Sequence, residues 1–175
     1  NEFHGVQGDI RSVGDFIRRW VTENNRWASP KFLLGESYGG IRATGLADHL
    51  QDEFGMSLNG VVLLSSLIDF RTLRSNQADD LSYPVFLPGL TGTAHYHKKI
   101  TGDRNALVEQ SRAFAFGEYS QALLKGAAIS AEEKKAVAEK LAKFTGLPAK
   151  LFIETNLRLS STRFRKELLR DEKKV

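Results

Sequence analysis

The stretch PKFLLGESYGGIRATGLADHL, residues 30–50, changes from a short apolar run to five small or polar residues and then to a helical pattern. Gly35, Ser37 and Gly39 within it form the pattern G-x-S-x-G. In proteins with this pattern the serine occupies a sharp, strained turn between a strand and a helix, and its hydroxyl is exposed. Because the flanking segments have that order here, the sequence predicts that Ser37 is a nucleophile on a strand-to-helix turn.

The residues around Ser37 suit the same turn. Gly35 and Gly39 leave room where a side chain would collide with the adjoining strand or helix, and Gly40 keeps the first helical turn close to the sheet. The backbone N–H of Tyr38 follows the serine at the positive end of the predicted helix, where it can stabilise an oxyanion. A glycine-rich turn with an incidental serine is the structural alternative.

Residues 1–70 have the pattern of an α/β core segment. Apolar residues at helical spacing between 13 and 21 predict a first helix, and Ser12 with Asp15 resembles a capping box at its start. Residues 32–34 predict a strand, and 41–54 a helix closed by Gly55. The continuous apolar run VVLLSSLI, 61–68, predicts a second, parallel strand buried on both faces. Together these segments form a βαβ unit with a right-handed crossover.

Residues 71–175 have a different, mainly helical pattern. The segments 105–124 and 130–144 predict helices, with a capping box at Ser130 and Glu133 and a stop at Gly146. The segment 81–104 is rich in proline and glycine and predicts irregular structure. We therefore expect two regions, a core segment with the nucleophile turn and a helical region.

Composition narrows the classes of function. The chain has 175 residues, a net charge of +4 and no cysteine, which excludes disulfides and thiolate zinc sites. No run is apolar and long enough to span a bilayer, and the first residues are too polar for a signal peptide. Charges of both signs alternate at helical spacing in residues 158–175, which favours a solvated helix over a nucleic-acid site.

The sequence GESYGG, residues 35–40, resembles the nucleophile signature of the serine carboxypeptidases, whose usual form is G-E-S-Y-A/G-G. These enzymes are α/β-hydrolases that remove single residues from peptide C-termini. The stretches LNGVVLLSSLIDF (58–70), FAFGEY (114–119) and NLRLSSTRFRKELLRDE (156–172) also resemble bacterial members of the family.

This resemblance implies a partial α/β-hydrolase fold in residues 1–70 and a cap or insertion in residues 71–175. It implies Ser37 as nucleophile, Tyr38 as the backbone N–H donor to the oxyanion, and Glu36 as part of the site for the terminal carboxylate of the substrate. Because an ionised Glu36 would repel that carboxylate, this role needs a proton, held by burial or by a second carboxylate.

The sequence lacks other parts of the family pattern. The later strands that carry the catalytic Asp and His are absent, as are the second oxyanion donor and the partner carboxylate of Glu36, so the chain resembles an internal fragment. Inside it, Asp69 at the end of the second predicted strand is a candidate acid, and His95 is a candidate base. His95 and His97 also have a metal-ligand spacing, but they lack a third ligand, so we expect no metal.

We therefore predict a serine-type carboxypeptidase whose acid and base lie outside this chain, so that the chain alone is inactive. An esterase or acyltransferase of the same fold, and a non-catalytic interaction module retaining it, are the alternatives. We expect a peptide with a free C-terminus as substrate, no cofactor, and no binding to nucleic acid or membrane. The open edges of a small sheet predict self-association. The location stays open, and the resemblance favours a secreted or periplasmic one.

Overall fold

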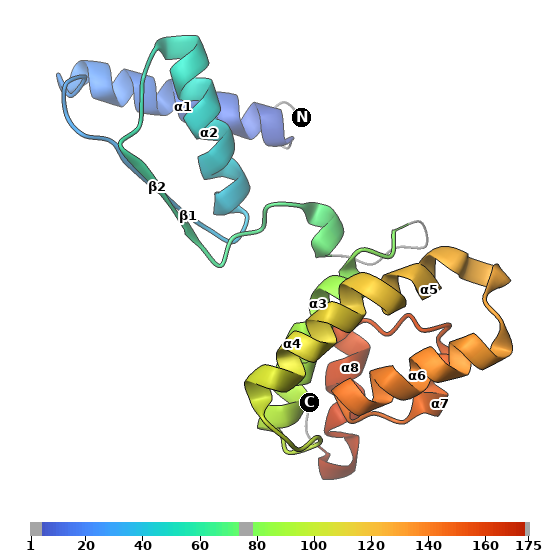
Figure 1. Cartoon of the computed structure of the whole chain (residues 1–175). Coiled ribbons are helices and arrows are strands. Elements are labelled where there is room, and N and C mark those ends of the chain that lie inside the picture. The colour runs from blue at the N-terminus through green and yellow to red at the C-terminus, as the bar shows by residue number, and fades with distance from the viewer. Residues whose placement is uncertain (1–4, 74–78, 174–175) are drawn as a thin grey trace. The chain divides into compact units, whose positions relative to one another are not determined.

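The computed structural model describes residues 5–73 and 79–173. The chain divides into two compact units, Asn1–Phe70 and Arg71–Val175 (Figure 1). The first unit contains both strands, and the second is built from helices.

The first unit has the order helix, strand, helix, strand. Helix α1 spans Val6–Glu23 and β1 spans Phe32–Glu36; α2 spans Gly39–Phe54 and β2 spans Gly60–Leu64. The strands are parallel, in a register that runs from Phe32 opposite Gly60 to Glu36 opposite Leu64. Their buried core comes mainly from the two helices and consists of Ile10, Val21, Leu46, Leu50 and Met56.

The predicted α/β-hydrolase fold is wrong. Helices dominate the described residues, and the sheet there consists of β1 and β2 alone. A single βαβ unit is local, so the spacing of hydrophobic residues can predict it. The sheet of an α/β-hydrolase needs further parallel strands with helices on both faces, and the described residues do not form those strands. In the first unit, α2 therefore packs on a two-stranded parallel sheet, and α1 packs on α2.

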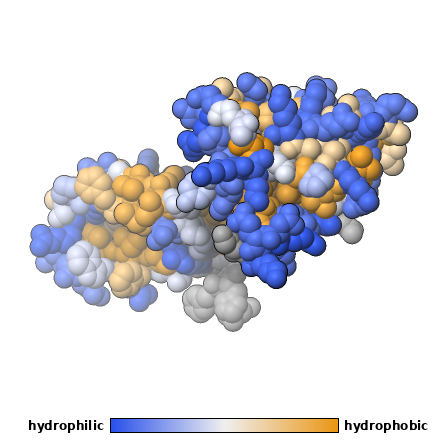
Figure 2. All heavy atoms as spheres, turned by 90° about the horizontal axis from the view of Figure 1, so that it is seen from below, coloured by the Kyte–Doolittle hydropathy of each residue, from blue (hydrophilic) through white to orange (hydrophobic). Residues whose placement is uncertain are grey.

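The expected burial of the second strand on both faces is also wrong. Phe32 and Leu34 of β1 are each 67% exposed, and Val62 and Leu64, on the same face of the sheet, are exposed as well. Side chains alternate between faces along a strand, and Leu33 points to the other face, where it packs on the helical core. Figure 2 shows hydrophobic residues gathered on the first unit. One face of the sheet is thus apolar and uncovered within its unit.

The first helix begins earlier than the sequence predicts. Helix α1 starts at Val6 after Gly5 as N-cap, so Ser12 lies inside the helix and caps nothing. The end of the second helix agrees with the sequence, because Gly55 follows α2 in the left-handed conformation with φ 62°.

The second unit is built from helices around one core. A short 3-10 turn, η1 (Phe70–Thr72), begins at the last residue of the first unit and includes the first two residues of the second. The longer helices are α3 (Ser82–Tyr96), α4 (Arg104–Phe114) and α6 (Ala131–Thr145). The shorter elements are the π-helix η2 (Ala115–Tyr119), α5 (Ser120–Lys125), η3 (Gly126–Ala128), α7 (Ala149–Glu154), α8 (Ser161–Leu168) and η4 (Arg170–Glu172).

The irregular structure predicted for residues 81–104 is wrong, because α3 lies there. Pro84 is in the first turn of the helix, where a missing N–H costs nothing. Pro88 is inside the helix and removes one backbone hydrogen bond. Burial of Leu87 and Ala94 in the core offsets this loss.

The other two predicted helices are confirmed. Residues 104–125 are helical, with η2 as a π-helical segment inside them, and α6 covers the predicted 130–144 segment. Ser130 caps α6 by accepting a hydrogen bond from the Glu133 N–H at 3.1 Å, and Gly146 ends it with φ 70°. Within the described residues, every helix is too short or too polar to cross a membrane.

Candidate functional site

Ser37 lies on a sharp turn between β1 and α2, as the sequence predicts. We call residues 35–40 the Ser37 turn. Ser37 is exposed and has φ 55°, in the left-handed region that residues other than glycine rarely adopt. Such a conformation costs about 1–3 kcal/mol, so the surrounding structure must hold it.

The backbone of Ser37 is held by β2 and by the loop that follows β2. The Ser37 N–H donates to the Leu64 carbonyl at 3.2 Å, and the Leu67 N–H donates to the Ser37 carbonyl at 2.9 Å. Ser66 adds a side-chain bond, because its hydroxyl donates to the Gly35 carbonyl at 3.0 Å. The strained residue is therefore fixed from the neighbouring strand.

Two of the three glycines in the turn are required by close contacts. A Cβ on Gly35 would lie 2.0 Å from the Gly39 carbonyl oxygen, and one on Gly40 would lie 2.3 Å from the Ser66 Cβ. The predicted collision at Gly39 is wrong, because a Cβ there meets nothing within 4 Å. Close approach of strand and helix thus depends on Gly35 and Gly40.

The Tyr38 N–H lies at the start of α2, directly after the serine. None of the described residues accepts a hydrogen bond from it. An unpaired N–H at this end of a helix stabilises negative charge. The turn therefore combines an exposed serine with a backbone N–H that has no acceptor among the described residues.

The Tyr38 side chain belongs to a cluster with Asp9 and Arg42. The Tyr38 hydroxyl donates to Asp9 Oδ2 at 3.0 Å, and Arg42 donates to both Asp9 oxygens at 2.8 and 2.9 Å. Hydrogen bonding from Arg42 holds the pKa of the Asp9 carboxyl below its usual value. The pKa of Tyr38 is raised, mainly by burial and to a smaller extent by the hydrogen bond to Asp9. The cluster ties the start of α2 to α1.

The sequence contains no pattern that predicts this cluster as a whole. Arg42 follows Tyr38 by one helical turn, and its guanidinium lies 5.4 Å from the centre of the Tyr38 ring, a contact that the spacing allows. Asp9 lies on another helix, and no local pattern connects it to either residue. The Ser66 contacts are equally non-local.

We expect Asp9→Asn to destabilise the first unit by about 1 kcal/mol at pH 7, because it breaks a two-bond ion pair. The pKa of Asp9 is lower in the folded state than in the unfolded state. The ionised carboxylate therefore contributes to folding stability at a pH above the unfolded pKa of about 3.9, and this contribution is lost as the pH falls below that value. The difference from wild type should therefore shrink towards pH 3.

Urea unfolding monitored by tryptophan fluorescence measures this effect, since both tryptophans, Trp20 and Trp27, belong to the first unit. Asp15→Asn is the matched control, because Asp15 is an exposed acid on α1 whose carboxylate lies 3.9 Å from the Arg18 guanidinium. If Asp9→Asn destabilised the first unit equally at pH 7 and pH 3, the stabilisation would not come from the charge of the Asp9 carboxylate, and the prediction would be contradicted.

A groove of about 540 Å³ runs beside the Ser37 turn. Glu36, Ser37, Tyr38 and Arg42 give it polar groups, and Glu36 is exposed. The remaining lining is largely aliphatic and comes from α1, β1 and α2: Val13, Ile17, Leu33, Leu34, Gly35, Gly39, Ala43 and Leu46.

The candidate acid and bases are distributed over both units. Asp69 is half-buried in the first unit, shortly after the loop that binds Ser37. His49, on α2, packs edge-on against Phe54, about three helical turns beyond Ser37. His95 belongs to the second unit, where its Nε2 lies 3.0 Å from the Gly102 carbonyl oxygen. His97, next to it, contacts the Tyr96 ring.

Within the first unit, the structure thus brings Glu36, Ser37 and Tyr38 together with the glycines of the turn, but it places no histidine of the described residues beside Ser37. Across the described ranges, no group of three or more His, Cys, Asp or Glu side chains has a geometry for a metal ion.

Comparison of the chain with protein-family models, with curated proteins and with solved structures finds no match in any of the three. The resemblance to serine carboxypeptidases therefore depends on the sequence of the Ser37 turn and on the three other stretches, 58–70, 114–119 and 156–172.

Proposed function

We propose that Ser37 is the nucleophile of a serine-type carboxypeptidase, and that its catalytic acid and base come from outside residues 1–175. The observation that carries the proposal is the geometry of the Ser37 turn: an exposed hydroxyl on a residue with φ 55°, followed by an N–H without an acceptor in the described residues. Strain of this kind is concentrated at functional sites.

The proposed reaction has two acyl-transfer steps. Ser37 Oγ attacks the last peptide carbonyl while a base takes its proton, and the Tyr38 N–H donates to the oxygen that becomes negative. The C–N bond then breaks, the released amino acid takes the proton, and the acyl group stays on Ser37. Water attacks this ester in the same way and regenerates the hydroxyl.

Glu36 distinguishes a carboxypeptidase from a general esterase. It lines the same groove as Ser37 and directly precedes it, so a substrate whose carbonyl lies at Ser37 brings its terminal carboxylate into reach of this residue. Glu36 is exposed, and we propose that a second carboxylate from outside residues 1–175 lies beside it and completes the site for the terminal carboxylate.

In the native protein we expect Glu36→Ala to raise KM about tenfold for a peptide with a free C-terminus, because a hydrogen bond to a charged group is lost. The same change should leave KM for the C-terminal amide and for an ester substrate unaltered. Steady-state kinetics with the three matched substrates measures this. Asp48→Ala, which removes an exposed acid on α2 away from the Ser37 turn, is the control. Equal changes for all three substrates would remove the carboxypeptidase assignment and leave an esterase or acyltransferase.

A non-catalytic interaction module is a second candidate, favoured by the uncovered apolar face of β1 and β2. Exposed patches of this kind mark interaction sites, and open strand edges pair with further strands. We propose that the chain itself associates through these strand edges. A sedimentation coefficient that rises with protein concentration would support this proposal. A protein that binds partners yet never reacts at Ser37 would fit this candidate and not the enzyme.

A further inference from the structure

A second cavity lies wholly within the second unit and is independent of Ser37. It has a volume of about 350 Å³, within the range of small-molecule sites. Lys134 from α6 and Asn156 and Arg158 from the turn after α7 supply its polar side chains. Its other lining residues are short or aliphatic: Ala122, Gly126, Ala127, Ile129 and Leu157.

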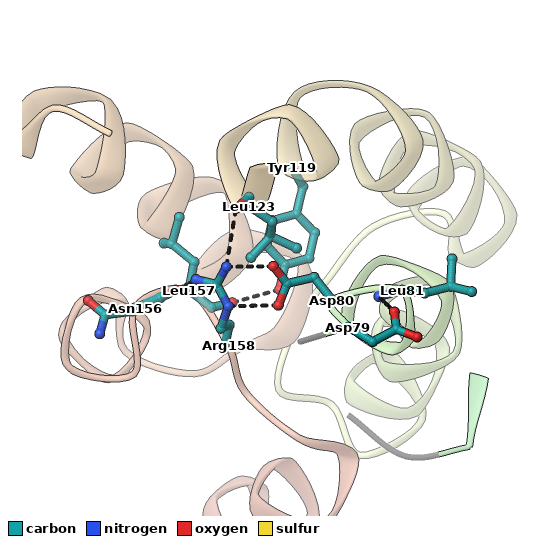
Figure 3. Close-up of polar contacts among 8 residues, drawn as sticks. All are labelled: Asp79, Asp80, Leu81, Tyr119, Leu123, Asn156, Leu157 and Arg158. Carbon is teal, nitrogen blue, oxygen red and sulfur yellow. Dashed lines mark hydrogen bonds and ion pairs between the residues drawn. The ribbon is translucent and has the colours of Figure 1, made fainter. Parts of the chain in front are cut away.

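The turn that forms one wall is strained and firmly held. Asn156 and Leu157 both have left-handed conformations, with φ 51° and 66°, although neither is glycine. The buried Tyr119 hydroxyl donates to the Leu157 carbonyl at 2.6 Å (Figure 3). Tyr119 ends the π-helix η2, a type of irregularity that is frequent at functional sites.

Arg158 fixes the same turn from its other end. Its guanidinium donates to both Asp80 oxygens, at 2.7 and 2.5 Å, to the Leu123 carbonyl at 3.1 Å and to the Asn156 carbonyl at 3.0 Å (Figure 3). The positive charge of Arg158 is thereby balanced by Asp80. The wall of the cavity is therefore rigid before any ligand binds, which lowers the entropy cost of binding.

Lys134 supplies the charge of the cavity. Its Nζ donates to Asn156 Oδ1 at 2.6 Å, a neutral acceptor, and no carboxylate of the described residues forms an ion pair with it. Nearby lysines differ, since Lys125 is paired with Glu133 and Lys140 with Glu118. An ammonium has three donors, so Lys134 retains two for a ligand. The cavity thus carries one positive charge without a counter-charge.

We propose that this cavity binds a small organic carboxylate, with its oxygens on Lys134 Nζ and the Asn156 amide nitrogen and its aliphatic body against Ala122, Ala127 and Ile129. A monoanion matches the single unbalanced charge of Lys134, whereas a dianion such as phosphate would leave one of its charges without a partner. The aliphatic lining favours a ligand with a short hydrocarbon chain.

Titration of the whole chain with sodium butyrate, followed by amide chemical shifts, tests this proposal. We expect saturable shifts at Asn156 and its neighbours, about tenfold weaker binding of the uncharged butyramide, and a loss of about tenfold for butyrate in Lys134→Met. Lys143→Met, an exposed lysine on the same helix, should bind butyrate as wild type does.

Butyramide needs no variant, so the test stands even if Lys134→Met fails to fold. Equal affinity for butyrate and butyramide, unchanged affinity in a folded Lys134→Met, or absence of saturable shifts at the cavity would each overturn the proposal.

Discussion

Replacing Gly35 with alanine should destabilise the first unit by about 3 kcal/mol, at the upper end of what overpacking costs. The new Cβ would lie 2.0 Å from the Gly39 carbonyl oxygen and 2.5 Å from the Gly39 carbonyl carbon. These are backbone atoms of the first turn of α2, so they cannot rotate away as a side chain would. The helix must move off the strand, and the backbone bonds that hold Ser37 must weaken with it.

Gly39→Ala is the matched control, because it adds the same methyl group four residues along the same turn. A Cβ there meets nothing within 4 Å, and alanine in a helix is favoured over glycine by up to about 1 kcal/mol. Urea unfolding of both variants, followed by fluorescence of Trp20 and Trp27, compares them within the first unit. Equal stability of the two variants would show that the strand and helix do not approach as closely as described.

Ser37→Ala should abolish peptidase turnover in the native protein, by about a millionfold if Ser37 acts with a base as in other serine hydrolases. The exposed side chain of Ser37 makes little contact, so the variant should keep wild-type stability. Substrate turnover and urea unfolding of the same preparation measure both. Loss of turnover together with loss of stability would point to a structural role for the serine.

A chain of residues 1–175 alone should show no steady turnover, because no histidine of the described residues in the first unit lies beside Ser37. Turnover by this chain that disappears in Ser37→Ala would show that it contains its own base, and His95→Ala would then test the histidine that the sequence favours.

The Ser37 turn could be predicted because its determinants are local. The spacing of the glycines and the change from an apolar run to a helical pattern both lie within residues 30–50. These two features are enough to predict the exposed serine and the helix that follows it. The role expected of Gly39 was wrong because a glycine pattern does not say which position makes the close contact. That contact belongs to Gly35, against the backbone of α2, and to Gly40, against Ser66.

Features that depend on distant residues could not be predicted. An apolar run such as VVLLSSLI indicates a strand, but it does not state how many neighbours the strand has or whether helices cover both faces. Asp9 meets Tyr38 and Arg42 across two helices without any sequence signal. Helix α3 was missed because Pro84 and Pro88 lower its local preference, and core burial overrides that preference.

Mass spectrometry of the native protein after treatment with a fluorophosphonate, a reagent that phosphonylates activated serines, tests the role of Ser37 most directly. Trypsin cuts after Lys31 and Arg42, and the resulting peptide FLLGESYGGIR has Ser37 as its single serine. We predict that this peptide gains the phosphonyl mass on Ser37 as activity is lost, and that Ser37→Ala is not labelled. An enzyme inactivated by the reagent with this peptide unmodified would contradict Ser37 as the nucleophile.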